Sequence, residues 1–254
     1  MFQKQQEKTI KRQDFILDEK KSNFTLIESF RGLMTNIGFS IPKKEDGKGK
    51  VVCISSAVAG EGKSTVAVNL AVTCAHSGAR TVIVDCDTRK PRIKKFFKLD
   101  SPGIVPYLSG EETLENVIAQ NVMPNLDVII CRHPAPNPIT LLTAPSFDEM
   151  LERLVWNYDY VIIDTPPVGL VSDAVIIAQK TDGVVLVTRQ MYSNHRVLKE
   201  VVQSLEFANC RILGFVLNDF CFTGKSYYSG RYRYNYKYKY GYSDYKSRFS
   251  SPNN

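Results

Sequence analysis

The sequence predicts one doubly wound α/β domain, in which helices cover both faces of a mostly parallel sheet. From Val51 onward, short apolar runs alternate with segments of helical character. Such runs are typical of strands buried on both faces, and their alternation with helices indicates a parallel sheet. The chain of 254 residues is 43% hydrophobic and 23% charged, which excludes a wholly disordered protein and allows a sizeable core.

The first fifty residues are expected to precede this domain. Residues 1–22 are polar and mixed in charge, as in an extended arm. Apolar residues then recur at three- and four-residue spacing from Phe24 to Ile37, which predicts an amphipathic helix at about 23–38. Residues 41–50 combine a proline, glycines and charges, and are typical of a linker.

Six strands and five helices are predicted within the α/β domain, which we place at residues 51–222. The strands are expected at 51–56, 81–85, 126–131, 160–164, 183–188 and 211–218. The helices are expected between them, at about 63–77, 111–120, 146–156, 172–179 and 194–207. In such a sheet, ligands bind beyond the carboxyl ends of the strands.

The last segment, residues 223–254, differs in composition from the rest. Residues 225–248 carry seven bases and one acid, so they hold +6 of the chain's net charge of +7. The segment has no leucine, isoleucine or valine with which to build a core, and we expect a flexible, low-complexity tail. It contains nine of the thirteen tyrosines: Tyr227, Tyr228, Tyr232, Tyr234, Tyr236, Tyr238, Tyr240, Tyr242 and Tyr245.

Cysteine usage and hydropathy indicate the compartment. The six cysteines never form a C-x-x-C pair, so neither a zinc site nor a thioredoxin-like motif is indicated, and most lie in apolar runs as buried thiols do. No stretch approaches the ~18 apolar residues of a membrane span, and the N-terminus lacks the apolar block of a secretion signal. We therefore expect a cytosolic chain unless a partner tethers it.

A glycine-rich loop follows the first predicted strand. Residues 57–65, AVAGEGKST, match the spacing of a P-loop, whose backbone N–H groups surround phosphates at the start of a helix. Lys63 would reach the β- and γ-phosphates of ATP and Ser64 would bind Mg²⁺, although Ala57 replaces the first glycine of the pattern. The alternative is a glycine turn that happens to precede a helix. The expected nucleotide contacts in the loop are Gly60, Glu61, Gly62, Lys63, Ser64 and Thr65.

Three aspartates stand at the predicted carboxyl ends of strands. Asp85 and Asp87 end the run TVIVDCD, and Asp164 ends the run YDYVIID. All three can converge on the P-loop, and Asp164 occupies the place of a Walker B acid near Mg²⁺. For each aspartate alone, the alternative is a helix cap or a loop residue.

These motifs resemble those of the bacterial tyrosine kinases of capsule and exopolysaccharide gene clusters, which are P-loop NTPases related to the ParA/MinD-type ATPases. The aspartate motif followed by Arg-Lys-Pro-Arg, together with a terminal tyrosine cluster, is specific to them. The resemblance implies an ATP- and Mg²⁺-dependent protein-tyrosine kinase. The matching segments are residues 28–37, 59–71, 81–97, 160–174, 214–219 and the tyrosine-rich end.

The resemblance also implies roles for single residues. Lys63 and Ser64 look like the phosphate and Mg²⁺ ligands, and Asp87 and Asp164 like the acids that position the metal, directly or through water. Asp85 resembles the residue proposed to accept the tyrosine proton. Because a free aspartate, of pKa ~3.9, is a weak base toward a phenol of pKa ~10, metal positioning must supply most of the rate.

For a few further positions the resemblance implies a functional role, but an ordinary structural role is an alternative. Asn218 resembles the adenine-reading position of the ParA/MinD relatives, although a strand-end asparagine is also a common turn residue. Arg89 and Arg92 would meet phosphates or a neighbouring subunit, or would form a solvated basic turn.

The implied partners begin with a second copy of the chain. Glu28 and Arg31 resemble the family's subunit-contact motif, in which Met34 replaces a second arginine here, so residues 1–50 would form an arm and an oligomerisation helix. A homo-oligomer would phosphorylate in trans. The other implied partners are a membrane-anchored activator of the polysaccharide co-polymerase type, which would recruit the chain to the inner face of the cell membrane, and a cognate tyrosine phosphatase.

The sequence therefore predicts an autokinase that phosphorylates its own tail and regulates capsular or exopolysaccharide biosynthesis and export. The alternative is a nucleotide-switched ATPase scaffold that uses the basic aromatic tail for binding only. A positioning ATPase of the ParA/MinD type is disfavoured, since Val58 stands where those proteins carry a second lysine. The tail also has alternatives, as a sticky disordered segment or a nucleic-acid binder, but no RNA-binding module is visible and nucleic acid is not expected.

Overall fold

A seven-stranded, mostly parallel sheet forms the centre of the molecule in a computed structural model that describes residues 15–220. The strand order is β3-β4-β2-β5-β1-β6-β7, and every neighbouring pair is parallel except β3 and β4. The predicted doubly wound α/β fold is thereby confirmed. The strands are β1 (Lys50–Ser56), β2 (Thr81–Asp85), β3 (Ile118–Met123), β4 (Leu126–Ile129), β5 (Tyr160–Asp164), β6 (Gly183–Arg189) and β7 (Ile212–Asn218).

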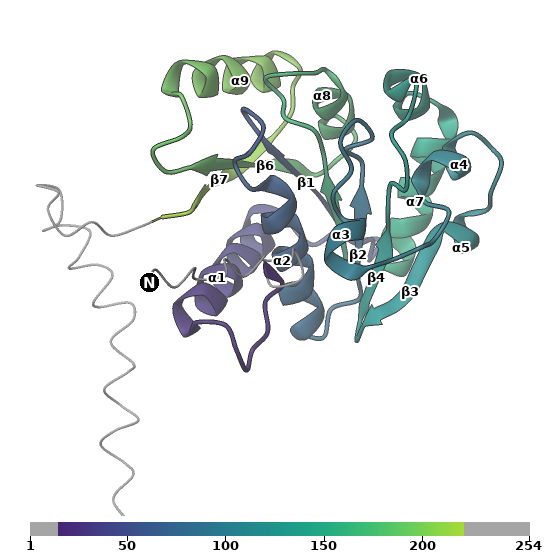
Figure 1. Cartoon of the computed structure of the whole chain (residues 1–254), viewed down its shortest axis with the longest axis horizontal. Coiled ribbons are helices and arrows are strands. Elements are labelled where there is room, and N and C mark those ends of the chain that lie inside the picture. Colours follow the sequence, from purple (N-terminus) through teal and green to yellow (C-terminus); the bar gives the residue numbers. More distant parts are fainter. Residues whose placement is uncertain (1–14, 221–254) are drawn as a thin grey trace, which may run out of the picture. The chain divides into compact units, whose positions relative to one another are not determined.

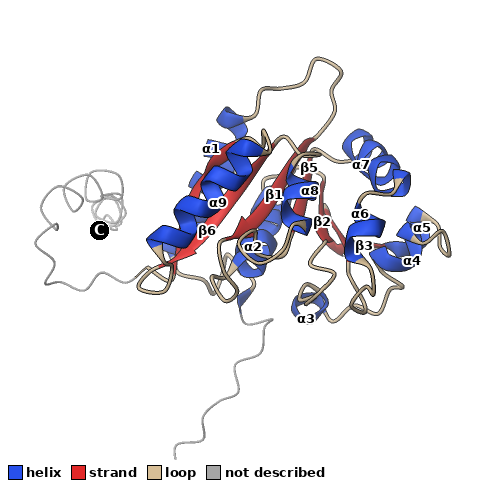
Figure 2. Cartoon of the chain, turned by 90° about the horizontal axis from the view of Figure 1, so that it is seen from above, coloured by secondary structure: helices blue, strands red, loops and turns tan. Residues whose placement is uncertain are grey.

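Helices cover both faces of this sheet. Figure 1 shows α8 and α9 on one side of the strands and α1 and α2 on the other, and Figure 2 shows β6, β1, β5 and β2 following one another across the sheet. The longer helices are α1 (Phe24–Ser40), α2 (Lys63–His76), α7 (Pro145–Asn157), α8 (Asp173–Ala178) and α9 (His195–Phe207). The short ones are α3 (Lys94–Phe97), α4 (Ile104–Leu108), α5 (Leu114–Val117) and α6 (Pro138–Leu142).

The central strand β1 explains why the apolar runs of the sequence are continuous. Its side chains alternate between two cores. Val51 and Cys53 join the core beneath α7, α8 and α9, whereas Val52 and Ile54 join the core beneath α1 and α2. All four are at most 4% exposed. A polar residue at any of these positions would be buried on one face or the other.

The N-terminal helix agrees with the prediction, but the residues before it do not. Helix α1 begins after Asn23, whose side chain accepts a hydrogen bond from the amide of Thr25. The expected extended arm is already packed at its described end, because Leu17 is 5% exposed and its amide donates to Asn69 Oδ1 on α2 at 2.8 Å. The described residues before α1 are therefore held against α2 through Leu17.

The predicted helix at 111–120 is wrong. Only Leu114–Val117 is helical, and the chain then forms β3, which pairs antiparallel with β4. Asn121 and Asn125 adopt φ values of 51° and 61°, which interrupt a right-handed helix, and the amide of Asn121 donates to Asp127 Oδ1 at 2.7 Å. A hairpin across Pro124 and Asn125 therefore replaces the helix.

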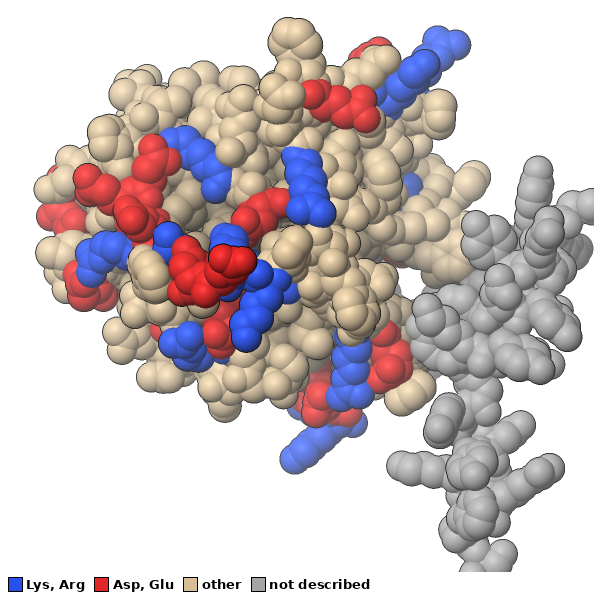
Figure 3. Space-filling model, turned by 180° about the vertical axis from the view of Figure 1, so that it is seen from behind, with Lys and Arg blue, Asp and Glu red and all other residues tan. Residues whose placement is uncertain are grey.

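The short helices α3, α4 and α6 were not predicted either, whereas the other features of the described range are close to prediction. Five cysteines are buried and free of disulfides. Each helix there is too short or too polar to span a bilayer. On the face drawn in Figure 3, acidic and basic side chains are interspersed, in keeping with the low net charge of the chain outside the tail. Residues Met1–Asp219 form one unit and Phe220–Asn254 a second, and residues 1–14 and the tail lie outside the described residues.

Candidate active site

The P-loop connects β1 to α2 at the carboxyl end of the sheet. Gly60 and Gly62 have φ values of 90° and 94°, a left-handed region that glycine enters without strain. A Cβ at Gly62 would stand 2.0 Å from Asn218 Nδ2, so a larger residue would have to displace the Asn218 side chain. Lys63 and Ser64 are the first residues of α2, and this helix end presents N–H groups and a positive dipole to anions.

The lysine of this loop lies among the predicted acids. Lys63 Nζ is 2.7 Å from Asp87 Oδ2 and 3.5 Å from Asp164 Oδ1, and it also lies 3.4 Å from Ser64 Oγ. Asp164 ends β5 and pairs in register with Asp85, which ends the neighbouring strand β2. The structure therefore brings together the three aspartates that the sequence placed at strand ends.

Burial and mutual charge shift the pKa values in this cluster. Burial raises the pKa of Asp164, although the nearby Lys63 ammonium opposes the rise. Burial by itself would lower the pKa of Lys63, but the charges of Asp164 and Asp87 raise it above the ordinary value. The lysine is therefore firmly protonated, and it neutralises only part of the acidic charge around it.

The surroundings of the two Asp164 carboxylate oxygens indicate whether the site fits a metal ion. Both are buried, and neither makes a hydrogen bond of ordinary geometry with any described residue, although the Lys63 ammonium forms an ion pair with Oδ1 at 3.5 Å. A buried carboxylate without such bonds is costly unless a cation or water approaches it. The described residues contain no group of three His, Cys, Asp or Glu side chains that could hold a metal alone. Mg²⁺ needs only one or two carboxylates when phosphates and waters complete its shell, so these residues fit it.

Asp85 is held differently from the other two acids. Its Oδ2 accepts hydrogen bonds from the amides of Arg92 and Ile93 at 3.0 and 2.9 Å, and its Oδ1 accepts from the amide of Asp87 at 3.2 Å. The side chain is fully buried. Burial and the charge of Asp164 raise the pKa of Asp85 to about 8, against the effect of the Ile93 amide. Asp85 thus anchors the loop that carries Asp87.

The arginines of that loop have separate partners. The Arg89 guanidinium binds the fully buried Asp173 of α8 through Nε and Nη2, at 2.7 and 2.9 Å. This ion pair joins the loop after β2 to the segment after β5, and Asp173 was not singled out in the sequence. Arg92 contributes its backbone amide to Asp85.

Of the remaining predicted residues, some lie at the P-loop and others lie on α1. The Glu61 carboxylate is buried and accepts from the amide of Val58 at 2.8 Å. Asn218 donates from Nδ2 to the Glu61 carbonyl at 2.9 Å, while Thr65 follows Ser64 in the first turn of α2. On α1, Arg31 pairs with Glu28 and Glu19, both at 2.8 Å. The nine tail tyrosines lie outside the described residues.

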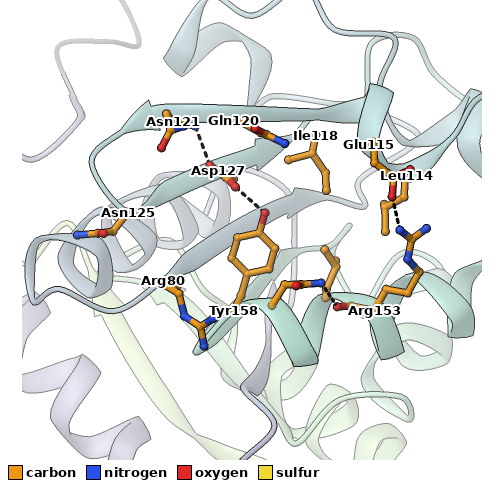
Figure 4. A pocket seen from close by; sticks show the side chains of 12 residues that line it. Arg80, Leu114, Glu115, Ile118, Gln120, Asn121, Asn125, Asp127, Arg153 and Tyr158 are labelled. Atoms are coloured by element: carbon orange, nitrogen blue, oxygen red, sulfur yellow. Dashed lines mark hydrogen bonds and ion pairs between the residues drawn. The ribbon is translucent and has the colours of Figure 1, made fainter.

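A polar hollow of about 450 Å³ lies at the other end of the sheet, where β2, β4 and β5 begin (Figure 4). Its charged side chains are paired with neighbours. Arg153 binds Glu115, and the hydroxyl of Tyr158 donates to Asp127 Oδ2 at 2.5 Å. Because these groups satisfy one another and lie far along the strands from the P-loop, we assign the hollow no part in the reaction.

The fold and the site define a P-loop nucleotide-binding protein of the ParA type. The family model described as "ParA: NUBPL iron-transfer P-loop NTPase" matches residues 48–237. Tyrosine-protein kinase CpsD of Streptococcus agalactiae is 38% identical over 193 residues, which cover 75% of this chain and 82% of that protein. The chain therefore belongs to the bacterial P-loop tyrosine-protein kinases.

Solved structures agree with this assignment. The kinase domain of the Escherichia coli tyrosine kinase ETK is 30% identical, with a TM-score of 0.73 over 80% of this chain and 78% of that one. The septum site-determining protein MinD from Pyrococcus horikoshii, complexed with Mg-ADP, is 27% identical, with a TM-score of 0.57 over 70% of this chain and 72% of that one.

The raised pKa of Asp85 predicts a pH-dependent stability. Between about pH 4 and pH 8 the folded state holds a proton on Asp85 that the unfolded state has lost, so stability falls as pH rises through this window. Asp85→Asn keeps an oxygen acceptor but cannot titrate. We expect its melting temperature to change less with pH than that of the unsubstituted chain, measured by thermal unfolding at pH 5, 6.5 and 8. Parallel pH profiles for the two proteins would contradict this assignment.

Proposed function

We propose that this tyrosine kinase is an autokinase, which transfers the γ-phosphoryl group of ATP to tyrosines of its own tail. The observation that carries phosphoryl transfer is the position of the Lys63 ammonium at the P-loop, 2.7 Å from Asp87 and 3.5 Å from Asp164. A cation beside paired acids at a helix N-terminus is the arrangement that phosphoryl transfer requires, since catalysis there depends on positioning and on charge stabilisation.

The nucleotide and the metal would be held by different groups of the cluster. The backbone amides of residues 60–65 would surround the phosphates, and Lys63 would exchange its carboxylate partners for phosphate oxygens. Ser64, Asp87 and Asp164 would hold Mg²⁺, directly or through water. When bound, Mg²⁺ neutralises charge on the transferring phosphoryl group. Asn218 would lie at the outer edge of this site, toward the adenine.

Asp85 is proposed as a positioning residue. Its carboxylate is fully buried and binds three amides of the loop 87–93, so it sets where Asp87 stands. A pKa of about 8 is closer to that of a phenol than is the pKa of free aspartate, but it also means that Asp85 holds a proton at neutral pH and can accept one from tyrosine only above about pH 8. Accepting that proton directly, as the resemblance implies, would require the loop to open.

The tail is proposed as the substrate because it starts beside the site. Asn218, the last residue of β7, contacts the P-loop at Glu61, and Tyr227 follows nine residues later. Nine residues span at most about 30 Å when extended. The tyrosines can therefore approach the P-loop of their own chain or that of a neighbour, and tethering gives them a high effective concentration.

Self-association and a membrane partner complete the proposal. Glu28 and Arg31 would form part of a contact between copies, in which they would exchange their present intrachain ion pairs for intermolecular ones. A membrane-anchored activator of the polysaccharide co-polymerase type would recruit the chain to the inner face of the membrane, where phosphorylation would regulate capsular or exopolysaccharide assembly and export. A tyrosine phosphatase would reverse the modification.

Intact-protein mass spectrometry after incubation with ATP and Mg²⁺ tests where the phosphate goes. We expect a ladder of phosphate additions on the full chain, and none on a chain truncated after Thr223. A chain with all nine tail tyrosines replaced by phenylalanine is the matched control, because it keeps the length and charge of the tail. Each protein is measured with and without membrane extract containing the activator. Phosphate on the truncated chain would place the acceptor outside the tail and contradict the proposal.

A further inference from the structure

The loop between β6 and α9, residues 190–194, lies against the P-loop. The hydroxyl of Tyr192 donates a hydrogen bond to the carbonyl of Ala59 at 3.0 Å. The same hydroxyl is 3.1 Å from where a Cβ would stand on Gly60, so the two loops are in van der Waals contact as well. The Arg189 guanidinium lies 5.4 Å from the centre of the Tyr192 ring, a cation–π distance, and forms an ion pair with Asp219. These contacts help to hold the Tyr192 side chain in place.

A second contact from this loop reaches the buried acid of the P-loop. The Ser193 hydroxyl donates to Glu61 Oε1 and accepts a hydrogen bond from the amide of Arg189 at 2.7 Å. Glu61 Oε2 accepts from the amide of Val58 at 2.8 Å. The Glu61 side chain is fully buried, so these bonds compensate the loss of its hydration. Ser193 therefore fixes the carboxylate that in turn fixes the start of the P-loop.

The third contact comes from the end of β7. Asn218 Nδ2 donates to the carbonyl of Glu61 at 2.9 Å and packs against Gly62 so closely that a Cβ there would clash. Tyr192, Ser193 and Asn218 together hold residues 59–62, the part of the P-loop that precedes Lys63. We refer to these three residues as the P-loop clamp.

We propose that the P-loop clamp pre-organises the phosphate-binding backbone and thereby sets the affinity for nucleotide; this inference rests on the nucleotide site of the proposed function. Amides that already point toward a ligand lose less conformational entropy when the ligand binds. The clamp residues are positioning residues, because they act through the carbonyls of Ala59 and Glu61 and the Glu61 carboxylate. Tyr192 is half exposed, so the clamp is accessible at the surface.

Amide hydrogen exchange of the nucleotide-free protein tests the clamp without any ligand. We expect exchange in residues 57–65 to be about twofold to tenfold faster in Tyr192→Phe and Ser193→Ala, since each loses one hydrogen bond to the P-loop. Ser193→Thr keeps a hydroxyl and should restore slow exchange. Tyr158→Phe is the matched control, because it removes a tyrosine hydrogen bond at the opposite end of β5 (Figure 4).

Titration with a fluorescent ADP analogue and Mg²⁺ gives the second readout. The dissociation constant should rise about twofold to tenfold in Tyr192→Phe and Ser193→Ala, and should stay unchanged in Ser193→Thr and Tyr158→Phe. Unchanged exchange in residues 57–65 of the variants would overturn the clamp proposal. Faster exchange throughout the molecule would overturn it too, because a general loss of stability would then be the cause. A protein that binds no nucleotide would instead overturn the proposed function, and the exchange experiment would still decide the clamp.

Discussion

Lys63→Met should slow phosphoryl transfer by about a hundredfold to a thousandfold while leaving the fold in place. Methionine has a similar length but no charge, so the phosphates would lose the cation that the P-loop directs at them. Removing one preorganised charged group from such a site costs about a hundredfold to a thousandfold in rate. The measurement is phosphate incorporated per chain over time, by mass spectrometry, at saturating ATP and Mg²⁺.

The same substitution should also lower stability in a pH-dependent way. Without Lys63, the buried Asp87 and Asp164 lose a cation at 2.7 and 3.5 Å, and charge repulsion is relieved only when protons bind. The loss of melting temperature should therefore be larger at pH 8 than at pH 5. Lys50→Met is the matched control. Its ammonium donates to the Gly38 carbonyl at 2.8 Å, remote from the site, so this variant should keep full activity. Undiminished transfer in Lys63→Met would refute the assigned site.

Asp164→Asn should raise stability and destroy activity. The Asp164 carboxylate is fully buried and makes no hydrogen bond of ordinary geometry with described residues. The Lys63 ammonium at 3.5 Å compensates its burial only in part, because the pKa of Asp164 remains raised, so its charge costs folding energy. An amide of the same shape removes that cost at neutral pH. It also removes a proposed ligand of Mg²⁺, which should slow transfer by at least about a hundredfold. Melting temperature without nucleotide and phosphate incorporation are measured on the same preparation.

The control is an aspartate with a structural role, for which we expect the opposite result: lower stability and unchanged activity. Asp182 accepts a hydrogen bond from the amide of Val51 at 2.7 Å and pairs with Lys44 at 3.0 Å. Asp182→Asn should lower the melting temperature and leave transfer intact. If Asp164→Asn instead lost stability and kept its activity, Asp164 would be a structural residue and the metal assignment would fail.

Much of the fold was predictable because strands that are buried on both faces of the sheet appear in the sequence as continuous apolar runs. Each residue of β1 from Val51 to Ile54 faces one of two cores, so the run must be apolar throughout. The convergence of Asp85 and Asp164 follows from the geometry of parallel strands, whose carboxyl ends share one edge. Motif spacing then placed Lys63 within reach of these acids, and the structure shows it there.

Other features depend on contacts that leave no local signal. The strand β3 formed where a helix was predicted, because asparagines in left-handed conformations and a Pro-Asn turn favoured a hairpin. Two of the three amides that hold Asp85 come from residues seven and eight positions further on, and no side-chain pattern shows where a loop will fold back. Tyr192 and Ser193 lie more than 130 residues from the P-loop in sequence, so their contacts with it appear only in three dimensions.

The fate of the γ-phosphate in a single turnover tests the central claim most directly. The full chain is mixed with a limiting amount of γ-labelled ATP, Mg²⁺ and membrane extract containing the activator, and protein-bound label is separated from inorganic phosphate. An autokinase should leave the label on tail tyrosines, and the chain with nine phenylalanines should leave it on ATP. Label recovered as inorganic phosphate from both proteins, with none on tyrosine, would contradict the autokinase and favour a nucleotide-switched scaffold.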